Sequence, residues 1–147
     1  MNLSEISVII TTFNEEPNIE VCLDRLDGFG EIVIVDSFSG DGTLDIARRY
    51  PAVVYVRPYE SAARQKNWAL QRVRHRWVLI LDADEVMTDE LRREIESFDE
   101  SNGVHGFWIR RGGYINHRRV HCGCSGPDLP AAGRFLVGFA ILRNGSR

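Results

Sequence analysis

The sequence predicts an α/β protein whose mostly parallel sheet is flanked by helices. Four short runs rich in valine and isoleucine recur in the first two thirds of the chain, and each is nearly continuous rather than alternating, which is typical of strands buried on both faces. Helical patterns with short connections lie between these runs and favour βαβ units with right-handed crossovers. The length of 147 residues is about that of one domain, on a prior of roughly 150 residues per domain.

Each predicted helix has an apolar stripe at helical spacing and a plausible start. Pro17 is tolerated in the first turn of the first helix, and Thr88 is a plausible N-cap for the last one. In chain order the predicted elements are strand 6–12, helix 16–26, strand 31–36, helix 42–50, strand 52–57, helix 61–74, strand 77–82 and a helix after Thr88. The stripes are Ile19, Cys22, Leu23 and Leu26; then Ala62, Ala69, Leu70 and Val73; then Leu91, Ile95 and Phe98.

The last third of the chain is predicted to differ from the rest. Residues 107–111 and 114–120, separated by two glycines, indicate a C-terminal hairpin or a pair of antiparallel strands. The 27 residues after Val120 contain five of the 13 glycines and two of the five prolines. We therefore expect a folded domain over 1–120 and a divergent or poorly ordered tail over 121–147, in which 135–142 is a candidate closing strand.

Composition and charge exclude several classes of protein. Apolar residues make up 44% and charged residues 27%, as in an ordinary globular protein, and no apolar run approaches the ~20 residues of a membrane helix. The net charge of −3 gives no reason to expect a nucleic-acid partner. The last 47 residues carry seven arginines and one acid. These arginines either face an anionic substrate or membrane lipid, or are scattered on the surface.

The cellular location is predicted from cysteine usage and the N-terminus. Three cysteines are an odd number and too few for a disulfide scaffold, and no secretory signal is evident. We expect a cytoplasmic protein with reduced thiols, and a peripheral place at the inner face of the membrane as an alternative. The sequence predicts no oligomeric state.

Polar clusters follow three of the predicted strands, at 11–15, 36–43 and 82–85. In open α/β sheets, ligands bind at the carboxyl ends of the strands, so the three clusters are expected to meet at one edge. Asp82 and Asp84 are two residues apart, which puts their side chains on the same side, where a Mg²⁺ or Mn²⁺ ion would relieve their repulsion. Alternatively, Asp82 caps the strand, and Asp84 and Glu85 are solvated turn residues.

Asp36 and the start of the helix at 61–74 offer further polar groups. Asp36 is a good acceptor for an N–H of a base or for a ribose hydroxyl, or else it heads a turn. Arg64 and Lys66 are two cations that either contact a diphosphate or form a solvent-exposed face of the helix. No dinucleotide-binding glycine pattern and no P-loop lysine is present in the sequence.

Three segments together resemble the motifs of the family-2 inverting glycosyltransferases, which have the GT-A fold. They are Ser7-Val-Ile-Ile-Thr-Thr-Phe-Asn-Glu15, Ile34-Val-Asp36 with the Ser/Gly/Asp loop to Thr43, and Leu79-Ile-Leu-Asp-Ala-Asp-Glu85. Order and spacing match over about residues 5–120. Residues 64–70 resemble the bacterial lipopolysaccharide-core branch. The resemblance implies a Rossmann-like GT-A domain that transfers a hexose, with inversion, from a nucleotide-diphosphate sugar, expected to be a UDP-sugar, to a cell-envelope glycan or lipopolysaccharide-core acceptor.

The resemblance also implies a role for each matching residue. The catalytic base is not among them, and Glu85 and Asp128 are the candidates for it. Thr11, Phe13 and Glu15 would line the nucleoside pocket, Asp36 would hold the uracil ring, Asp82 would meet the ribose, Asp84 would bind the Mg²⁺ or Mn²⁺ that bridges the diphosphate, and Arg64 and Lys66 would lie along the nucleotide or its phosphates.

Two alternatives to a working transferase remain open at the sequence level. Relatives continue well past this length, and the composition break near Val120 suggests a truncated, frame-shifted or divergent tail, which would leave a donor-binding module without turnover. The apolar run before Asp82-Ala83-Asp84 also fits the nucleophile motif of haloacid-dehalogenase-type phosphatases, but that motif normally opens the chain, and Lys66, the only lysine, precedes it.

Overall fold

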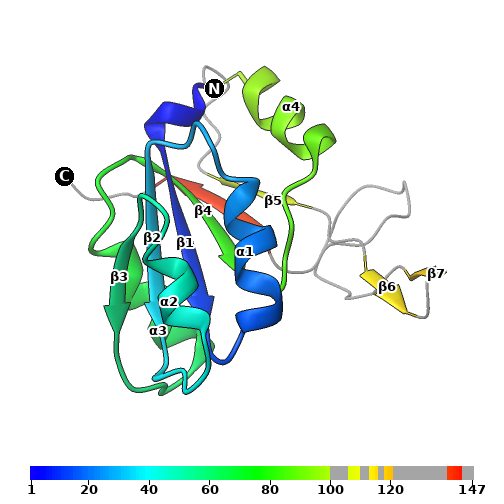
Figure 1. Cartoon of the computed structure of the whole chain (residues 1–147). Helices are drawn as coiled ribbons and strands as arrows, with labels where there is room; N and C mark the ends of the chain where they lie inside the picture. Colours follow the sequence, from blue (N-terminus) through cyan, green and yellow to red (C-terminus); the bar gives the residue numbers. More distant parts are fainter. Residues whose placement is uncertain (100–105, 110–112, 116–117, 121–138, 144–147) are drawn as a thin grey trace.

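Six strands form the central sheet, in the order β3-β2-β1-β4-β8-β5 (Figure 1). The computed structural model describes residues 1–99, 106–109, 113–115, 118–120 and 139–143. β1 to β4 run parallel, and β8 runs antiparallel to both of its neighbours. The predicted mostly parallel sheet is therefore confirmed. Its strands are β1 (Ile6–Thr12), β2 (Glu31–Asp36), β3 (Val53–Val56), β4 (Trp77–Asp82), β5 (Gly106–Ile109) and β8 (Phe139–Arg143).

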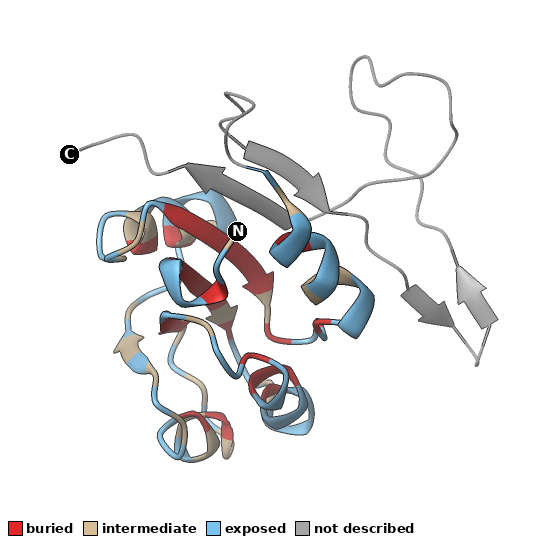
Figure 2. Cartoon of the chain, turned by 90° about the horizontal axis from the view of Figure 1, so that it is seen from above, coloured by how far each residue is buried: buried red, intermediate tan, exposed pale blue. Residues whose placement is uncertain are grey.

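Helices cover both faces of the parallel strands. One face packs against α1 and α4 and the short α2, and the opposite face packs against α3. β1, β2 and β4 are buried almost throughout, as Figure 2 shows, which explains why their sequences are continuously apolar, whereas β3 at the edge of the sheet is partly exposed. The helices are α1 (Glu16–Asp24), α2 (Thr43–Ala47), α3 (Ala62–Leu70) and α4 (Asp89–Ser97), and a 3-10 turn over Leu3–Glu5 precedes β1.

The starts of α3 and α4 are fixed by side-chain caps. Ser61 accepts a hydrogen bond from the backbone N–H of Arg64, and Thr88 accepts one from the N–H of Leu91. Each cap satisfies one of the amide groups that the first turn of a helix leaves without a partner. The predicted N-cap at Thr88 is confirmed, as is the inward position of Ile95, which is buried.

The register of the parallel strands brings three strand ends together. Thr12 at the end of β1 lies beside Asp36 at the end of β2, and Thr11 lies beside Asp82 at the end of β4. The loops that follow these strands therefore share one edge of the sheet, as the sequence predicts. This edge is where an open α/β sheet binds its ligands.

A polar network closes the opposite edge of the sheet. Ser7 of β1 donates from its hydroxyl to Glu31 Oε2 at 2.8 Å, and the backbone N–H of His75 donates to the Ser7 oxygen at 3.2 Å. Arg74 holds the other Glu31 oxygen through Nε at 3.2 Å. Glu31 is buried, so these partners replace the water that its carboxylate loses.

The predicted C-terminal hairpin has a different pairing from the expected one. Within the described residues, β5 pairs with β8 and not with β6 or β7, and the hairpin is formed by β6 (Gly113–Ile115) and β7 (Arg118–Val120). Residues 107–109 are apolar, as is most of β8, whereas β7 begins with two arginines, so β5 is better suited to extend the main sheet. β8 supplies the closing strand expected within 135–142, and the rest of the predicted tail lies outside the described residues.

No helix in the described part of the chain is both long enough and apolar enough to cross a membrane.

Candidate functional site

Asp82 is the centre of a small polar cluster at the end of β4. Its Oδ1 atom accepts a hydrogen bond from the Thr11 hydroxyl at 3.1 Å and lies 2.9 Å from Lys66 Nζ. Thr11 comes from β1 and Lys66 from α3, so three elements contribute to this cluster. The side chains of Lys66 and Asp82 are 24% and 35% exposed, which leaves both within reach of a ligand.

Asp84 lies in the turn after β4 and is exposed. The alternation that would point Asp84 the same way as Asp82 ends at Asp82, because the backbone N–H of Glu85 closes a turn onto the Asp82 carbonyl at 3.0 Å. The turn removes the strand alternation on which that expectation was based. Asp82 pairs with Lys66 of α3. Burial, with a further contribution from Asp84, raises the pKa of the Cys22 thiol to about 12.

The donor atoms at this edge suit a hard divalent cation that also has a ligand on the substrate. Asp84 offers an exposed carboxylate, the oxygen donor that Mg²⁺ and Mn²⁺ prefer. Within the described residues, no three His, Cys, Asp or Glu side chains converge closely enough to enclose a metal ion. A cation held by Asp84 would therefore complete its shell with water and phosphate oxygens, as Mg²⁺ commonly does.

Asp36 is fully buried at the end of β2 and is held by the loop that follows it. The backbone N–H of Ser39 donates to Asp36 Oδ1 at 2.9 Å, and the Ser39 hydroxyl donates to Oδ2. This geometry makes Asp36 the head of a turn. An ionised carboxylate has about four acceptor positions, so the two bonds from Ser39 leave capacity for a further donor.

The loops after β1 and β2 are tied to each other. The backbone N–H of Asn14 donates to the Ser39 hydroxyl oxygen at 2.8 Å, and the N–H of Gly40 donates to Asn14 Oδ1 at 2.8 Å. The N–H of Glu15 donates to the Thr43 hydroxyl oxygen at 2.8 Å. Phe13, the residue before Asn14, is 56% exposed. These bonds bring Phe13, Glu15 and Asp36 into one neighbourhood, as the sequence predicts.

Arg64 and Glu85 have partners within the chain. Arg64 is exposed at the start of α3 and forms an ion pair with Glu60, which also binds Arg57. Glu85 is buried and accepts a hydrogen bond from the Asp82 backbone N–H at 2.7 Å, so it supports the turn that presents Asp84. Asp128, the other candidate base, lies outside the described residues.

Gln65 is a polar residue of this edge that the sequence reasoning did not select. It is 1% exposed, and its Nε2 atom donates to the Ser37 hydroxyl oxygen at 2.9 Å, which joins α3 to the loop after β2. Its Oε1 atom has no hydrogen-bond partner among the described residues. The sequence contains one signal for Gln65. It lies between Arg64 and Lys66, in a helix whose face opposite Gln65 is solvated.

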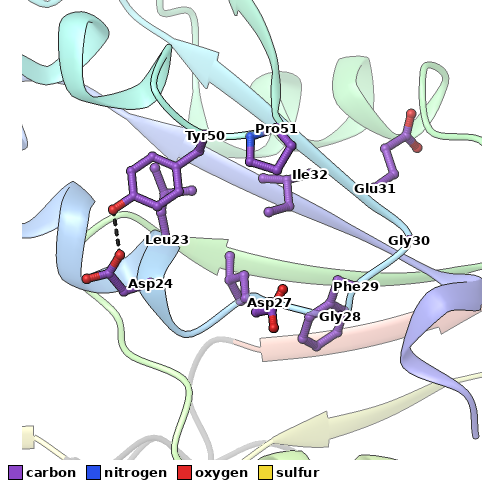
Figure 3. Close-up of a pocket in the computed structure, with 11 residues that line it drawn as sticks. Leu23, Asp24, Asp27, Gly28, Phe29, Gly30, Glu31, Ile32, Tyr50 and Pro51 are labelled. Atoms are coloured by element: carbon purple, nitrogen blue, oxygen red, sulfur yellow. Dashed lines mark hydrogen bonds between the residues drawn. The ribbon is translucent and has the colours of Figure 1, made fainter.

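A pocket of about 400 Å³ lies at the other end of the sheet, away from these residues (Figure 3). It is bounded by the end of α1, the start of β2 and Tyr50, whose hydroxyl donates to Asp24 Oδ1 at 2.6 Å. That hydrogen bond is the main cause that raises the pKa of Tyr50 to about 12. None of the predicted site residues lines this pocket, so the candidate site remains the edge formed by the ends of β1, β2 and β4.

Comparisons with known proteins show the family of the chain. A model of glycosyl transferase family 2 matches residues 7–133. The lipopolysaccharide core biosynthesis glycosyltransferase LpsC of Rhizobium meliloti is 33% identical over 116 residues, which are 75% of this chain and 43% of LpsC.

Two solved structures resemble the fold. The mannosyltransferase PcManGT from Pyrobaculum calidifontis, in complex with GDP-Man and Mn²⁺, is 28% identical with a TM-score of 0.61, covering 73% of this chain and 36% of its own. Residues 1–349 of TarS from S. aureus, in complex with UDP-GlcNAc, are 26% identical with a TM-score of 0.60, covering 87% of this chain and 37% of that one. The chain thus spans less than half the length of each of these three proteins.

Proposed function

The chain belongs to glycosyl transferase family 2 and has its GT-A fold, and we propose that it binds a UDP-sugar and transfers the hexose, with inversion, to a cell-envelope glycan or lipopolysaccharide-core acceptor. One observation carries the proposal: the exposed Asp84 adjoins the cluster of Asp82, Thr11 and Lys66 at the carboxyl edge of the parallel strands. LpsC acts in lipopolysaccharide core biosynthesis, which supports the acceptor class. The two solved relatives bind different nucleotides, so our assignment of uracil as the base rests on Asp36.

The donor would lie across the strand ends, with its base near β2 and its diphosphate near β4. Asp82, held by Thr11, meets the ribose hydroxyls. Lys66 has three N–H donors and uses one on Asp82, so the others can meet phosphate oxygens. Asp36 accepts from the base once the loop carrying Ser39 shifts, because the carboxylate is otherwise covered.

Bond breaking requires stabilisation of the diphosphate leaving group. A divalent cation, when bound at Asp84, supplies Lewis-acid neutralisation of that charge. Lys66, with Arg64 at the same end of α3, adds positive charge from the protein itself. A carboxylate base would deprotonate the acceptor hydroxyl as it attacks the anomeric carbon from the opposite face, which inverts that carbon. Glu85 and Asp128 remain the candidates for this base.

The proposal places the protein in the cytoplasm, or at the inner face of the membrane. Nucleotide sugars and a lipid-linked acceptor would meet there, and the seven arginines of the last 47 residues would attract anionic headgroups.

The first test is nucleotide binding with and without metal. We expect UDP with Mn²⁺, at about 100 times its Kd, to raise Tm by about 5–10 °C, because ligand at that excess stabilises a protein by about 2.7 kcal/mol. Equal stabilisation by ADP, GDP and UDP would contradict the uracil assignment, and no dependence on Mn²⁺ or Mg²⁺ would contradict the metal role of Asp84. Release of UDP from a UDP-hexose, stimulated by a lipopolysaccharide-core acceptor, separates a transferase from a binding module. A phosphoaspartate trapped at Asp82 would instead indicate the phosphatase.

The second test removes the proposed metal ligand. Asp84→Asn replaces one ionised oxygen at constant size in an exposed turn, so we expect unchanged folding and loss of the Mn²⁺-dependent part of UDP binding. Asp27→Asn, an equivalent exchange at the opposite edge of the sheet, is the matched control. Leu81→Asp, which buries a charge in β4, gives the signature of unfolding in the same melting assay. If Asp84→Asn melts as early as Leu81→Asp, Asp84 is structural.

A further inference from the structure

We propose that Phe38, in the loop after β2, provides a stacking face for the base of the donor nucleotide. This inference rests on the donor site proposed above and adds to it a residue that the motifs did not assign.

The backbone of Phe38 is in a conformation that its side chain does not favour. Its φ angle is +64°, in the left-handed region that bulky residues rarely occupy and that glycine occupies without strain. Among the described residues other than glycine, Asn14 alone shares a positive φ, at +52°, and asparagine tolerates this region well. A strained backbone that persists at a ligand edge points to a use for the side chain.

Packing in the core does not explain the strain. Phe38 is 61% exposed, so burial of its ring offsets little of the conformational cost. The neighbouring hydrogen bonds hold the loop instead: Ser39 donates to Asp36, and Asn14 donates to Ser39. They fix the backbone on both sides of Phe38 while leaving its ring in solvent.

The position of Phe38 favours contact with the base of the donor rather than with the transferred sugar. Phe38 follows Asp36 on β2, and the Asn14–Ser39 hydrogen bond joins its loop to the one that carries Phe13, the other exposed aromatic residue of this joint. β1 separates β2 from β4, and Asp84 lies in the turn after β4. The ends of β2 and β4 are therefore about 10 Å apart at a strand spacing of ~4.8 Å. A nucleotide that spans this distance places its base at the two phenylalanines and its diphosphate at Asp84.

The chemistry of an exposed aromatic ring fits this occupant. Every nucleobase has a flat π face, and stacking on an aromatic side chain is largely independent of base identity. Phe38 would therefore contribute affinity, whereas the hydrogen bond to Asp36 would contribute selection of uracil. Phe38 lies between Asp36, the last residue of β2, and Ser39, so the loop shift that uncovers Asp36 moves the ring as well, and one base engages both groups.

The test compares Phe38→Asn and Phe38→Tyr with the wild-type chain. Asparagine accepts the left-handed backbone but lacks the ring, and tyrosine keeps the ring. We expect Phe38→Asn to weaken UDP binding about fivefold or more, in calorimetric titration with Mn²⁺ present, while its Tm stays equal or rises. We expect Phe38→Tyr to bind like the wild type. Val21→Asn, which removes an exposed apolar side chain from α1, is the control and should leave UDP binding unchanged.

The possible outcomes separate this inference from the proposed function. If Phe38→Asn binds UDP as tightly as the wild-type chain does, the stacking role is overturned and the donor site stays intact. A lower Tm in Phe38→Asn that accounts for its weaker binding overturns it as well, because the residue is then structural. A wild-type chain that binds no nucleoside diphosphate overturns the proposed function and the inference with it.

Discussion

The ion pair between Lys66 and Asp82 shows how little stability a functional contact needs to supply. Both side chains are partly exposed, and the Nζ to Oδ1 distance is 2.9 Å. Ion pairs in such surroundings contribute about 1 kcal/mol or less, because water already stabilises both charges. The pair is better explained by the position that it gives to a cation at the strand ends than by the free energy of folding.

Lys66→Met tests this distinction at the residue scale. We expect the free energy of unfolding to fall by about 1 kcal/mol or less, because only a partly exposed ion pair is lost. UDP affinity should fall about tenfold or more, since a charge-assisted hydrogen bond contributes about 1.5–3 kcal/mol. Urea unfolding and calorimetric titration measure the two effects. Lys66→Arg should retain most of the affinity, and Arg76→Met, an exposed arginine beyond α3, should change neither quantity.

Side chains that look alike in the sequence differ in their surroundings, and this limits prediction of a site. The motifs predict that Asp36, Asp82 and Asp84 share one edge, and the parallel register confirms it for Asp36 and Asp82, with Asp84 in the turn that follows β4. They leave open whether Asp36 heads a turn and whether Asp84 is a solvated turn residue, and the structure shows that Asp36 is covered by Ser39 and that Asp84 is exposed in a turn that begins at Asp82. These differences depend on local backbone conformation after the strands end, where the alternation of side chains no longer applies.

Elements formed by local pattern could be predicted closely, and those that depend on distant pairing could not. The bounds of β1, β2 and β4 agree with the predicted strands, because a continuous run of apolar β-branched residues has few other solutions. β5 could not be assigned its partner, since β8 is about 30 residues further along the chain and nothing local connects them. The pairing of adjacent segments, 107–111 with 114–120, was therefore the natural expectation.

Capping of α4 gives a prediction at the element scale. Thr88→Ala removes the side-chain oxygen that accepts from the Leu91 N–H at 3.2 Å. We expect the free energy of unfolding to fall by about 1 kcal/mol, the usual cost of losing an N-cap. Thr88→Ser and Thr88→Asp keep an acceptor and should stay close to the wild type. Thermal unfolding checks this series; an unchanged Tm in Thr88→Ala would show that α4 is held by packing alone.

At the scale of the whole molecule, the two edges of the sheet have different tasks. The polar network around Glu31 closes the edge where the parallel strands begin, while the edge where they end presents exposed carboxylates, a cation and aromatic rings. The core between them is apolar and contains Cys22, which is fully buried on the inner face of α1. The stability of the sheet therefore depends on that thiol remaining uncharged.

Acid and alkali should destabilise the molecule through different groups. Hydrogen bonds from Thr43 lower the pKa of Asp41, and Arg64 lowers the pKa of Glu60. Stability from these carboxylates is present above their unfolded pKa values of about 4 and is lost as the pH falls through the lower folded values. Both are exposed, so this contribution is small. The thiol acts in the opposite direction, since its folded pKa is raised, and its contribution is lost as the pH rises.

Alkaline unfolding gives the last prediction. Between pH 9 and 12, the unfolded chain loses the Cys22 proton while the folded chain retains it, so the free energy of unfolding should fall by about 1.4 kcal/mol per pH unit from this group. Cys22→Ala should be less stable than the wild type at pH 8, because it leaves a small cavity, yet lose less stability as the pH rises. The difference between the two proteins should therefore shrink or reverse by pH 11. Urea unfolding at pH 8, 9, 10 and 11 measures both slopes, and Tyr50→Phe controls for the partly exposed phenol, whose pKa is also raised. Parallel slopes for Cys22→Ala and the wild type would assign the alkaline loss to another group.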